Sequence, residues 1–177
     1  MSILPYPILQ AHLRLLRLLP QAIEAMCLEL EREQHFLHDK QIRTIYFGGG
    51  TPSLVSPYEI ERLIDHARHL FDCSQIEEIT IEVNPDDVTP EYIEALRQTS
   101  VNRISIGVQS LDDSTLRFMG RRHSAEQARC AVRMLQEAGY DNISADIIFG
   151  VESATQESLA QTLQGVLEMG IQHISAY

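Results

Sequence analysis

Lysine and long apolar runs are scarce in this sequence, and closely spaced cysteines are absent. Lys40 is the only lysine, and 25 acidic residues stand against 14 basic ones, which gives a formal net charge of −11. No surface of such a chain carries the dense cationic stripe that duplex nucleic acid requires. We therefore expect no nucleic-acid partner.

The three cysteines, Cys27, Cys73 and Cys130, lie far apart in the chain. In a sequence of ordinary composition this spacing argues against a disulfide framework and indicates a reducing compartment, so we expect a cytoplasmic location. The short spacings of zinc or iron–sulfur ligands do not occur among them. A metal site built from these cysteines is therefore not expected.

The leucine-rich start, residues 3–19, is interrupted by prolines and by polar or charged residues: Pro5, Pro7, His12, Arg14 and Arg17. It lacks the apolar run of about 20 residues that a membrane span needs. It also lacks a charged leader followed by an apolar core and a cleavage site, so no signal peptide is expected. The length of 177 residues, 44% of them hydrophobic, predicts one packed domain.

Hydrophobic periodicity predicts a long helix over residues 8–38, in which Pro20 is expected to cause a kink or a break. Five short runs rich in β-branched or aromatic residues follow, and each has the length of a strand. These runs are residues 44–47, 78–83, 103–108, 142–149 and 173–177.

Helix start signals lie between the predicted strands. Ser56 is followed by a proline and by Glu59, a pattern typical of an N-cap with a capping box. Similar signals stand at four further positions: Thr89, Asp112, Ser124 and Thr155. Glycines stand where three of the predicted helices end: Gly120, Gly139 and Gly170. The order is therefore strand, loop and helix, repeated.

This order predicts an α/β fold with a parallel sheet and helices on its outside. A barrel and an open doubly wound sheet both satisfy it, but polar residues close to the C-terminal end of every strand favour a barrel. A complete barrel needs about 250 residues. We therefore predict an N-terminal helical segment over residues 1–41 and a partial parallel (β/α) barrel over residues 42–177, truncated at both ends.

Residues 47–52 read Phe-Gly-Gly-Gly-Thr-Pro, with three glycines directly after an apolar strand. Glycine lets backbone groups approach a bound carboxylate, ammonium or phosphate group closely. A plain tight turn explains the run equally well. A dinucleotide fingerprint is not favoured, because Ser53 occupies the position of its last glycine, and the Gly-Lys-Ser/Thr of a Walker loop is missing.

Three polar side chains interrupt apolar strands near their C-terminal ends: Glu82, Gln109 and Asp146. In a two-faced sheet each is a solvated position, whereas in a barrel strand each faces the interior, where an unpaired charge is costly without a partner. Arg121 and Arg122 follow Gly120, and a guanidinium beside this rim suits a carboxylate through forked hydrogen bonds. An exposed basic pair is the alternative.

The chain resembles the radical S-adenosylmethionine proteins related to oxygen-independent coproporphyrinogen III oxidase. The resemblance covers residues 42–177 and is carried by residues 46–54, 81–85, 102–110, 120–123 and 146–150. The Gly-Val-Gln-Ser and Gly-Arg-x-His forms within these segments are closer to the haem chaperone branch of the family than to the decarboxylating oxidase.

The resemblance implies a partial barrel that binds S-adenosylmethionine at its rim, and it gives a role to seven residues: Gly49, Gly50, Thr51, Glu82, Gln109, Arg121 and Asp146. It implies that the glycine turn meets the methionine end, that the acidic and amide side chains meet the ribose hydroxyls, and that the arginine meets the carboxylate. Haem or a porphyrin is a further ligand that the family suggests.

The family holds a [4Fe–4S] cluster on three cysteines spaced Cys-x3-Cys-x2-Cys, a motif that this sequence does not contain. We therefore expect the chain to be inactive by itself in an oxidoreductase reaction of porphyrin biosynthesis. The alternative is a non-catalytic module that binds S-adenosylmethionine or haem, and a barrel enzyme with a phosphate-binding glycine loop ranks last. The strands at residues 44–47 and 173–177 are expected to present open sheet edges through which copies of the chain associate. The alternative is that the leucines of the opening helix cover one of these edges.

Overall fold

The computed structural model describes residues 6–36 and 41–177, and the side chains of residues 18–36 and 41–177. Two short 3-10 turns, Pro52–Leu54 and Pro85–Asp87, follow the first two strands. The helices and strands are α1 (Tyr6–Glu33), β1 (Thr44–Phe47), α2 (Pro57–Leu70), β2 (Glu78–Val83), α3 (Pro90–Leu96), β3 (Arg103–Gln109), α4 (Asp113–Phe118), α5 (Ala125–Glu137), β4 (Ile143–Ile147), α6 (Gln156–Glu168) and β5 (His173–Ala176).

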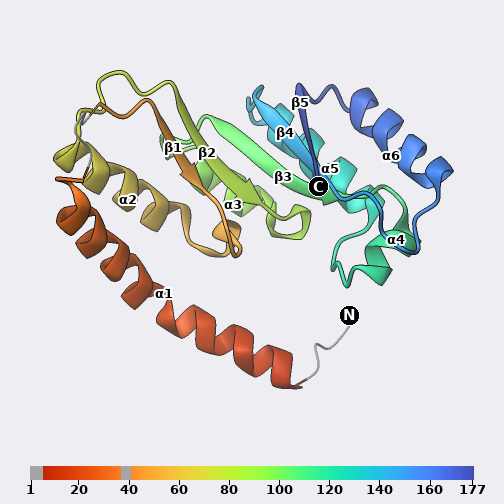
Figure 1. Cartoon of the computed structure of the whole chain (residues 1–177), viewed down its shortest axis with the longest axis horizontal. Coiled ribbons are helices and arrows are strands. Elements are labelled where there is room, and N and C mark those ends of the chain that lie inside the picture. The colour runs from red at the N-terminus through yellow and green to blue at the C-terminus, as the bar shows by residue number, and fades with distance from the viewer. Residues whose placement is uncertain (1–5, 37–40) are drawn as a thin grey trace.

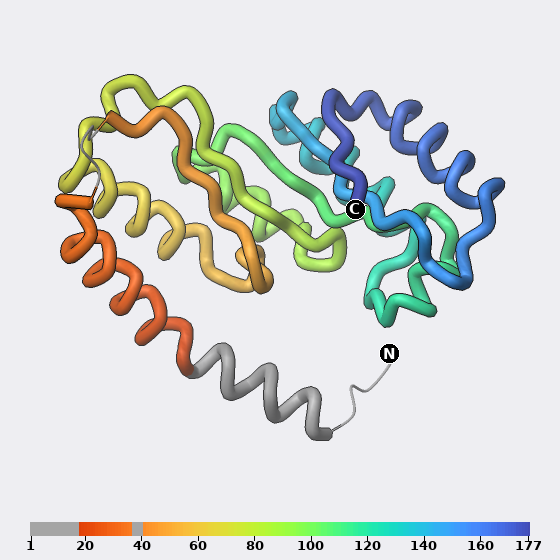
Figure 2. Tube along the Cα trace, viewed as in Figure 1, coloured from red at the N-terminus to blue at the C-terminus, as the bar shows by residue number. Residues whose placement is uncertain are grey.

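All five strands are parallel, and their order in the sheet is their order in the chain, β1-β2-β3-β4-β5. Figure 1 shows the sheet running from β1, beside α1 and α2, to β5, beside α6, and Figure 2 traces the same path. A doubly wound sheet reverses its strand order at a switch point, and this sheet does not. The predicted α/β fold with an open arc of a parallel barrel is therefore confirmed.

The predicted strands and helix starts agree closely with the structure. Ser56, Thr89, Ser124 and Thr155 are the N-caps of α2, α3, α5 and α6, and each accepts a backbone hydrogen bond. The largest error concerns β4, which spans Ile143–Ile147 instead of residues 142–149. The reason is that Ile148 and Phe149 donate single hydrogen bonds to Gln109 and Tyr177 beyond the regular ladder.

The first helix ends earlier than predicted. Of the two outcomes predicted for Pro20, a break does not occur, because the proline lies inside α1 and the helix continues on both sides of it. The helix ends at Glu33, whereas the predicted end, His38, lies outside the described residues. Ile23 and Cys27 of α1 are buried against Leu63 of α2, with Phe47 of β1 packed beside them. These contacts hold the C-terminal half of α1 on α2 and β1.

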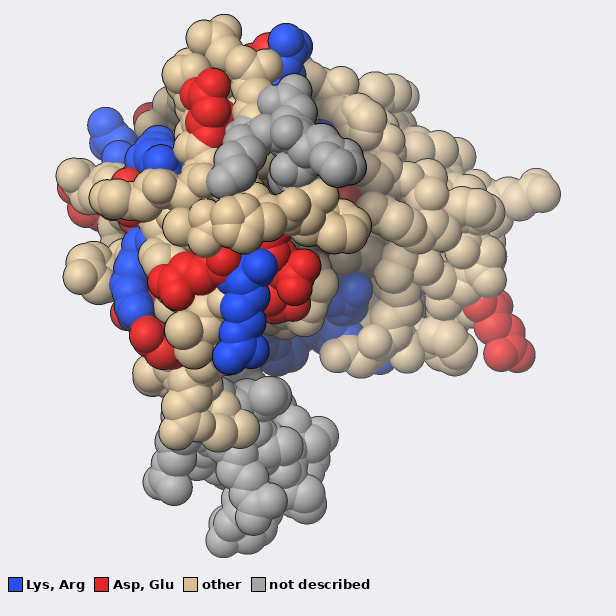
Figure 3. Space-filling view, turned by 60° about the vertical axis from the view of Figure 1, so that its left-hand side comes forward, with Lys and Arg blue, Asp and Glu red and all other residues tan. Residues whose placement is uncertain are grey.

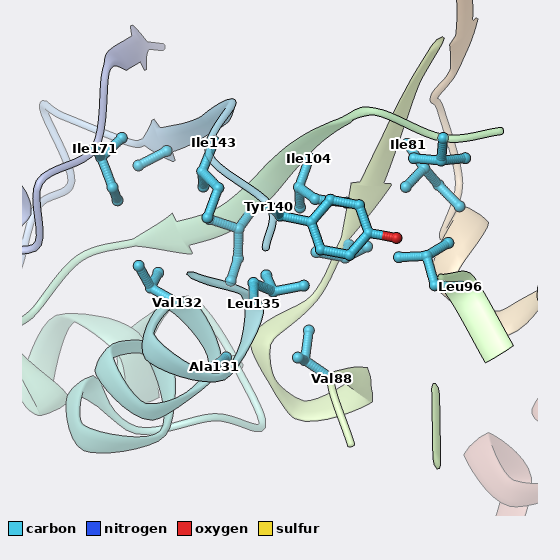
Figure 4. Packing of buried hydrophobic residues seen from close by; sticks show 14 of the residues in the cluster. Ile81, Val88, Leu96, Ile104, Ala131, Val132, Leu135, Tyr140, Ile143 and Ile171 are labelled. Atoms are coloured by element: carbon cyan, nitrogen blue, oxygen red, sulfur yellow. The ribbon is translucent and has the colours of Figure 1, made fainter. Parts of the chain in front are cut away.

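The hydrophobic core lies between one face of the sheet and the helices. The register pairs Ile81 with Ile104 and Ile104 with Ile143, so these isoleucines form a row on the helix side. All three are almost completely buried. Figure 4 shows the ring of Tyr140 lying between this row and Leu96 of α3. Since every crossover helix packs on this face, the opposite face is the inside of the arc.

The inside of the arc is polar. The register places Glu82 beside Ser105 and Ser105 beside Ser144, on the face opposite to the isoleucine row. Arg103 and Glu78 form an ion pair at the N-terminal end of the strands, with a closest N–O distance of 3.1 Å. The serine hydroxyls therefore lie in register with the Glu82 carboxylate on the inner face, and the Arg103–Glu78 pair lies at its N-terminal end.

Acidic and basic side chains are interspersed over α1 and α2. Arg62 of α2 pairs with Glu24 of α1 and with Glu59, and Arg68 pairs with Asp65. Figure 3 shows red and blue side chains side by side on this part of the surface. Such exposed pairs contribute little to stability, typically about 0–1 kcal/mol each. Within the described residues, no helix has both the length and the apolar character that crossing a membrane requires.

Candidate functional site

A cavity of about 170 Å³ lies at the C-terminal ends of β2, β3 and β4. Six of the seven residues predicted from the sequence line it: Gly50, Thr51, Glu82, Gln109, Arg121 and Asp146. They come from three strands, from the glycine loop after β1 and from the loop after α4. The geometry brings them together because the C-terminal ends of parallel strands meet at one edge of the sheet.

The seventh residue, Gly49, is exposed, lies outside the cavity lining and binds Glu82. Its amide donates a hydrogen bond of 3.1 Å to Oε2 of Glu82, and the Tyr46 hydroxyl donates one of 2.7 Å to Oε1. A Cβ on Gly48 would collide with the Tyr46 ring and lie 2.7 Å from the Glu82 carboxylate. The glycine run therefore brings the backbone onto Glu82 and fixes the direction of its carboxylate.

Burial and Glu82 raise the pKa of the Tyr46 hydroxyl to about 12, with burial the larger cause. Tyr46 therefore remains protonated, and remains a donor to Glu82, throughout the physiological pH range. This contact joins the first strand to the acidic side of the cavity.

Asp146 extends into the cavity from β4. The Ser105 hydroxyl lies 3.2 and 3.3 Å from its two oxygens, and Ser144 in turn donates to Ser105 at 3.1 Å. Burial raises the pKa of Asp146, and the nearby Glu82 acts in the same direction, while the Ser105 hydrogen bond opposes the shift. The two carboxylates therefore form an electronegative wall that favours a cation or a diol as a ligand.

Gln109 ends β3 in an unusual backbone conformation. Its φ of 64° lies in the left-handed region, and the register with β4 shifts between Ile106 and Gln109. A Cβ on Gly107 would lie 2.7 Å from Nε2 of Gln109. The missing side chain at Gly107 thus leaves space for the amide of Gln109, which is buried at the cavity edge. Strained residues of this kind concentrate at functional sites.

The two consecutive arginines have different surroundings. Arg122 points to Asp86 and Asp87, at 2.6 and 3.3 Å. Arg121 lines the cavity, and within the described part of the chain no carboxylate pairs with it. A guanidinium without a carboxylate partner is a ready site for the carboxylate of a ligand.

Two further residues of the site, Tyr46 and Ser105, were given no role from the sequence. They orient the two carboxylates. Asn84, one of the polar residues that end the predicted strands, also lines the cavity. Strand alternation places Ser105 on the same face as Gln109, so counting by two along β3 is a signal that finds it. No local pattern reveals the contact of Tyr46 with Glu82, because 36 residues separate the two in the chain.

The cysteines lie on separate elements and have different exposures. Cys27 is buried in α1, Cys73 is half-buried after α2, and Cys130 is exposed on α5. Burial raises the pKa values of Cys27 and Cys73, which opposes the thiolate form that binds metals. Across residues 18–36 and 41–177, no group of three His, Cys, Asp or Glu side chains is placed to hold a metal ion.

Comparison with known proteins identifies relatives over most of this chain. A model of the radical SAM superfamily matches residues 24–165. The haem chaperone HemW of Lactococcus lactis is 36% identical over 89% of this chain and 41% of its own length. The oxygen-independent coproporphyrinogen III oxidase of Bradyrhizobium diazoefficiens is 34% identical over 77% of this chain and 30% of its own length.

Among solved structures, the coproporphyrinogen III oxidase HemN of Escherichia coli matches with a TM-score of 0.77 and 28% identity, over 89% of this chain and 36% of that protein. Our chain thus spans less than half the length of these relatives. The match of the family model over most of the sequence establishes that the chain belongs to the radical SAM superfamily, whose cofactors are S-adenosylmethionine and a [4Fe–4S] cluster.

Proposed function

We propose that the cavity binds S-adenosylmethionine. The Arg121 guanidinium binds the carboxylate of the methionine moiety. The Asp146 carboxylate accepts hydrogen bonds from the ribose hydroxyls, and the Gln109 amide donates to them or accepts from them. Glu82 attracts the positive groups at the methionine end. Gly50 and Thr51 form the wall beside Glu82. When bound in this family, S-adenosylmethionine supplies the adenosyl radical chemistry.

One observation carries the proposal. Arg121, which has no carboxylate partner among the described residues, and two hydrogen-bonded carboxylates face the same cavity. S-adenosylmethionine carries one carboxylate, two positive groups and a ribose diol, so its charges match those of the cavity in sign. A phosphate ligand is less well matched, because Glu82 and Asp146 would repel it.

The residues present do not fit the iron–sulfur cluster. The family's three closely spaced cysteines are missing from the sequence, and the three cysteines that occur lie on three separate parts of the fold. We therefore propose that this chain binds S-adenosylmethionine without cleaving it. An assay after anaerobic reconstitution tests this point, with no 5′-deoxyadenosine as the expected result.

For the whole protein we propose a role in haem synthesis or haem delivery. The support is that the relatives are haem chaperones and coproporphyrinogen oxidases by name. The free cysteines are in keeping with a reducing compartment such as the cytoplasm. Titration with haemin, followed by its absorbance, tests the alternative that the chain itself is a haem-binding module.

Calorimetric titration with S-adenosylmethionine tests the main proposal. We expect the unaltered chain to bind, and Arg121→Gln to weaken binding about ten- to a hundredfold, the range for a lost charged hydrogen bond. Arg117→Gln on α4 is the matched control, because Arg117 is exposed and lies outside the cavity lining. Absence of binding to the unaltered chain, or equal affinity for the Arg121 variant, contradicts the proposal.

A further inference from the structure

A network of charged side chains lies directly behind the cavity. Asp87 is at its centre: Oδ2 accepts a hydrogen bond of 2.6 Å from Ser53, and Oδ1 lies 3.3 Å from Nη2 of Arg122. The same Nη2 lies 2.6 Å from Oδ2 of Asp86. These four residues come from the loops after β1, β2 and α4, which are far apart in the chain. We refer to Ser53, Asp86, Asp87 and Arg122 as the support network.

His123 connects this network to β3. Its Nε2 lies 3.1 Å from the carbonyl oxygen of Val108, and because a carbonyl only accepts, Nε2 carries the proton. Burial is the main cause of a lowered His123 pKa, so the ring is neutral at neutral pH. Nδ1 therefore carries no proton, and its 4.0 Å separation from Asp86 is a packing contact and not an ion pair.

Two members of this network, and the carbonyl group that His123 contacts, are next to residues of the cavity. Arg122 follows Arg121, Val108 precedes Gln109, and Ser53 is itself part of the lining. At the end of α4, the backbone amides of Gly120 and Arg121 donate to the carbonyl groups of Arg117 and Leu116, respectively. These bonds set the direction of the backbone at Arg121 and Arg122. The position of Arg121 thus depends on where Arg122 is held.

From this arrangement we infer that Asp86, Asp87 and Arg122 are positioning residues that direct the Arg121 guanidinium into the cavity. The consecutive arginines divide two tasks: Arg122 is anchored by two carboxylates, and Arg121 is left for the ligand. The side chains of Asp86 and Asp87 are 17% and 12% exposed and that of Arg122 is 45% exposed, so water screens these pairs from the Arg122 side and less from the carboxylate side. The inference rests on the proposed binding of S-adenosylmethionine where it concerns the ligand.

Hydrogen exchange of the ligand-free chain is the first test. In Arg122→Gln and Asp87→Asn we expect amide exchange to increase about three- to tenfold in residues 51–54 and 119–123 together, as the loss of a hydrogen bond predicts. In these two variants, exchange in α2 should stay the same. In the Arg117→Gln control, exchange in residues 51–54 and 119–123 should stay the same. An increase confined to the altered loop, or no increase, overturns the inference, because the loops are then held independently.

Ligand discrimination is the second test. S-adenosylmethionine carries the carboxylate that Arg121 is proposed to bind, and 5′-methylthioadenosine lacks it. We expect Arg122→Gln to weaken binding of S-adenosylmethionine about three- to tenfold while the affinity for 5′-methylthioadenosine stays the same. In the Arg121→Gln background the same substitution should have no further effect, because the group that it positions is gone.

The possible outcomes separate the two proposals. An equal loss of affinity for both ligands overturns the positioning role, because it reveals a general disturbance of the cavity. If the unaltered chain binds neither ligand, the proposed function fails, and the exchange experiment by itself then supports or overturns the linkage of the three loops.

Discussion

Asp146 illustrates a conflict between stability and binding at the scale of a single residue. Burial raises its pKa, so the folded chain binds the Asp146 proton more tightly than the unfolded chain. The stabilisation that this gives is complete below the ordinary pKa of a carboxyl group and is lost as pH rises through the raised value. At neutral pH the ionised carboxylate therefore lowers the free energy of unfolding.

We accordingly expect Asp146→Asn to raise stability at neutral pH, by up to about 1 kcal/mol or roughly 2–4 °C in Tm. The gain should shrink as pH falls toward the carboxyl range, because the native carboxyl is then protonated as well. Thermal unfolding at several pH values measures this, with exposed Asp141→Asn as the control. A Tm that falls, or a gain that does not depend on pH, contradicts the prediction.

Six residues that line the cavity stand out in the sequence because each interrupts an apolar strand or belongs to or follows a glycine turn. Glu82 and Asp146 are acids among isoleucines and valines, and alternation alone places them on the inner face. The side chains that orient them were not predictable in this way. Whether Glu82 contacts Tyr46 depends on the distance between two strands in space, and local spacing contains no information about that distance.

At the scale of elements, β3 ends in a bulge that lowers the free energy of unfolding. A residue other than glycine in the left-handed region costs about 1 kcal/mol, and Gln109 has a φ of 64°. We expect the free energy of unfolding of Gln109→Gly to exceed that of Gln109→Ala by about 1 kcal/mol. Both substitutions remove the side-chain amide, but only glycine adopts the positive φ without strain. Urea unfolding of the two variants measures the difference.

The two variants share the loss of the amide, so they should weaken S-adenosylmethionine binding equally. Equal stability of the two variants would mean that the backbone at this position is not strained. The bulge itself has no sequence signal, since the apolar run reads as a regular strand to its end. The N-caps, by contrast, were predictable: Ser124 and Gln127 form the complete capping box that their spacing indicates. At Ser56 the N-cap forms, but the predicted box does not, because the Glu59 carboxylate pairs with Arg62.

At the scale of the whole molecule, the sheet has two unpaired edges. Among the described strands, β1 pairs only with β2, and β5 pairs only with β4. An apolar groove of about 500 Å³ lies beside β1, between α1 and α2. Exposed sheet edges pair readily with other chains. We therefore retain the prediction that copies of the chain associate, with β5 of one copy beside β1 of the next.

Sedimentation velocity over a range of concentrations measures this association, and the average mass should rise with concentration. Thr44→Lys places a charge on the exposed edge strand and should reduce the rise, because edge lysines discourage strand pairing. Ala160→Lys on the exposed side of α6 adds the same charge away from the edge and should not. A single monomeric species at every concentration would rule out association through the edges.

The overall topology followed from the repeated order of strand and helix, because right-handed crossovers leave few alternatives. The long-range pairs did not follow from it. Arg122 finds Asp86 and Asp87 only after three loops have met at one end of the sheet, and consecutive arginines look alike in the sequence.

The polar inner face has a consequence for the shape of the protein. The concave face carries the side chains of Glu82, Ser105, Ser144 and Asp146, so water that fills it meets polar groups and not an apolar surface. Exposure of this concave face to water therefore costs little free energy, and no second layer of apolar side chains is required to cover it.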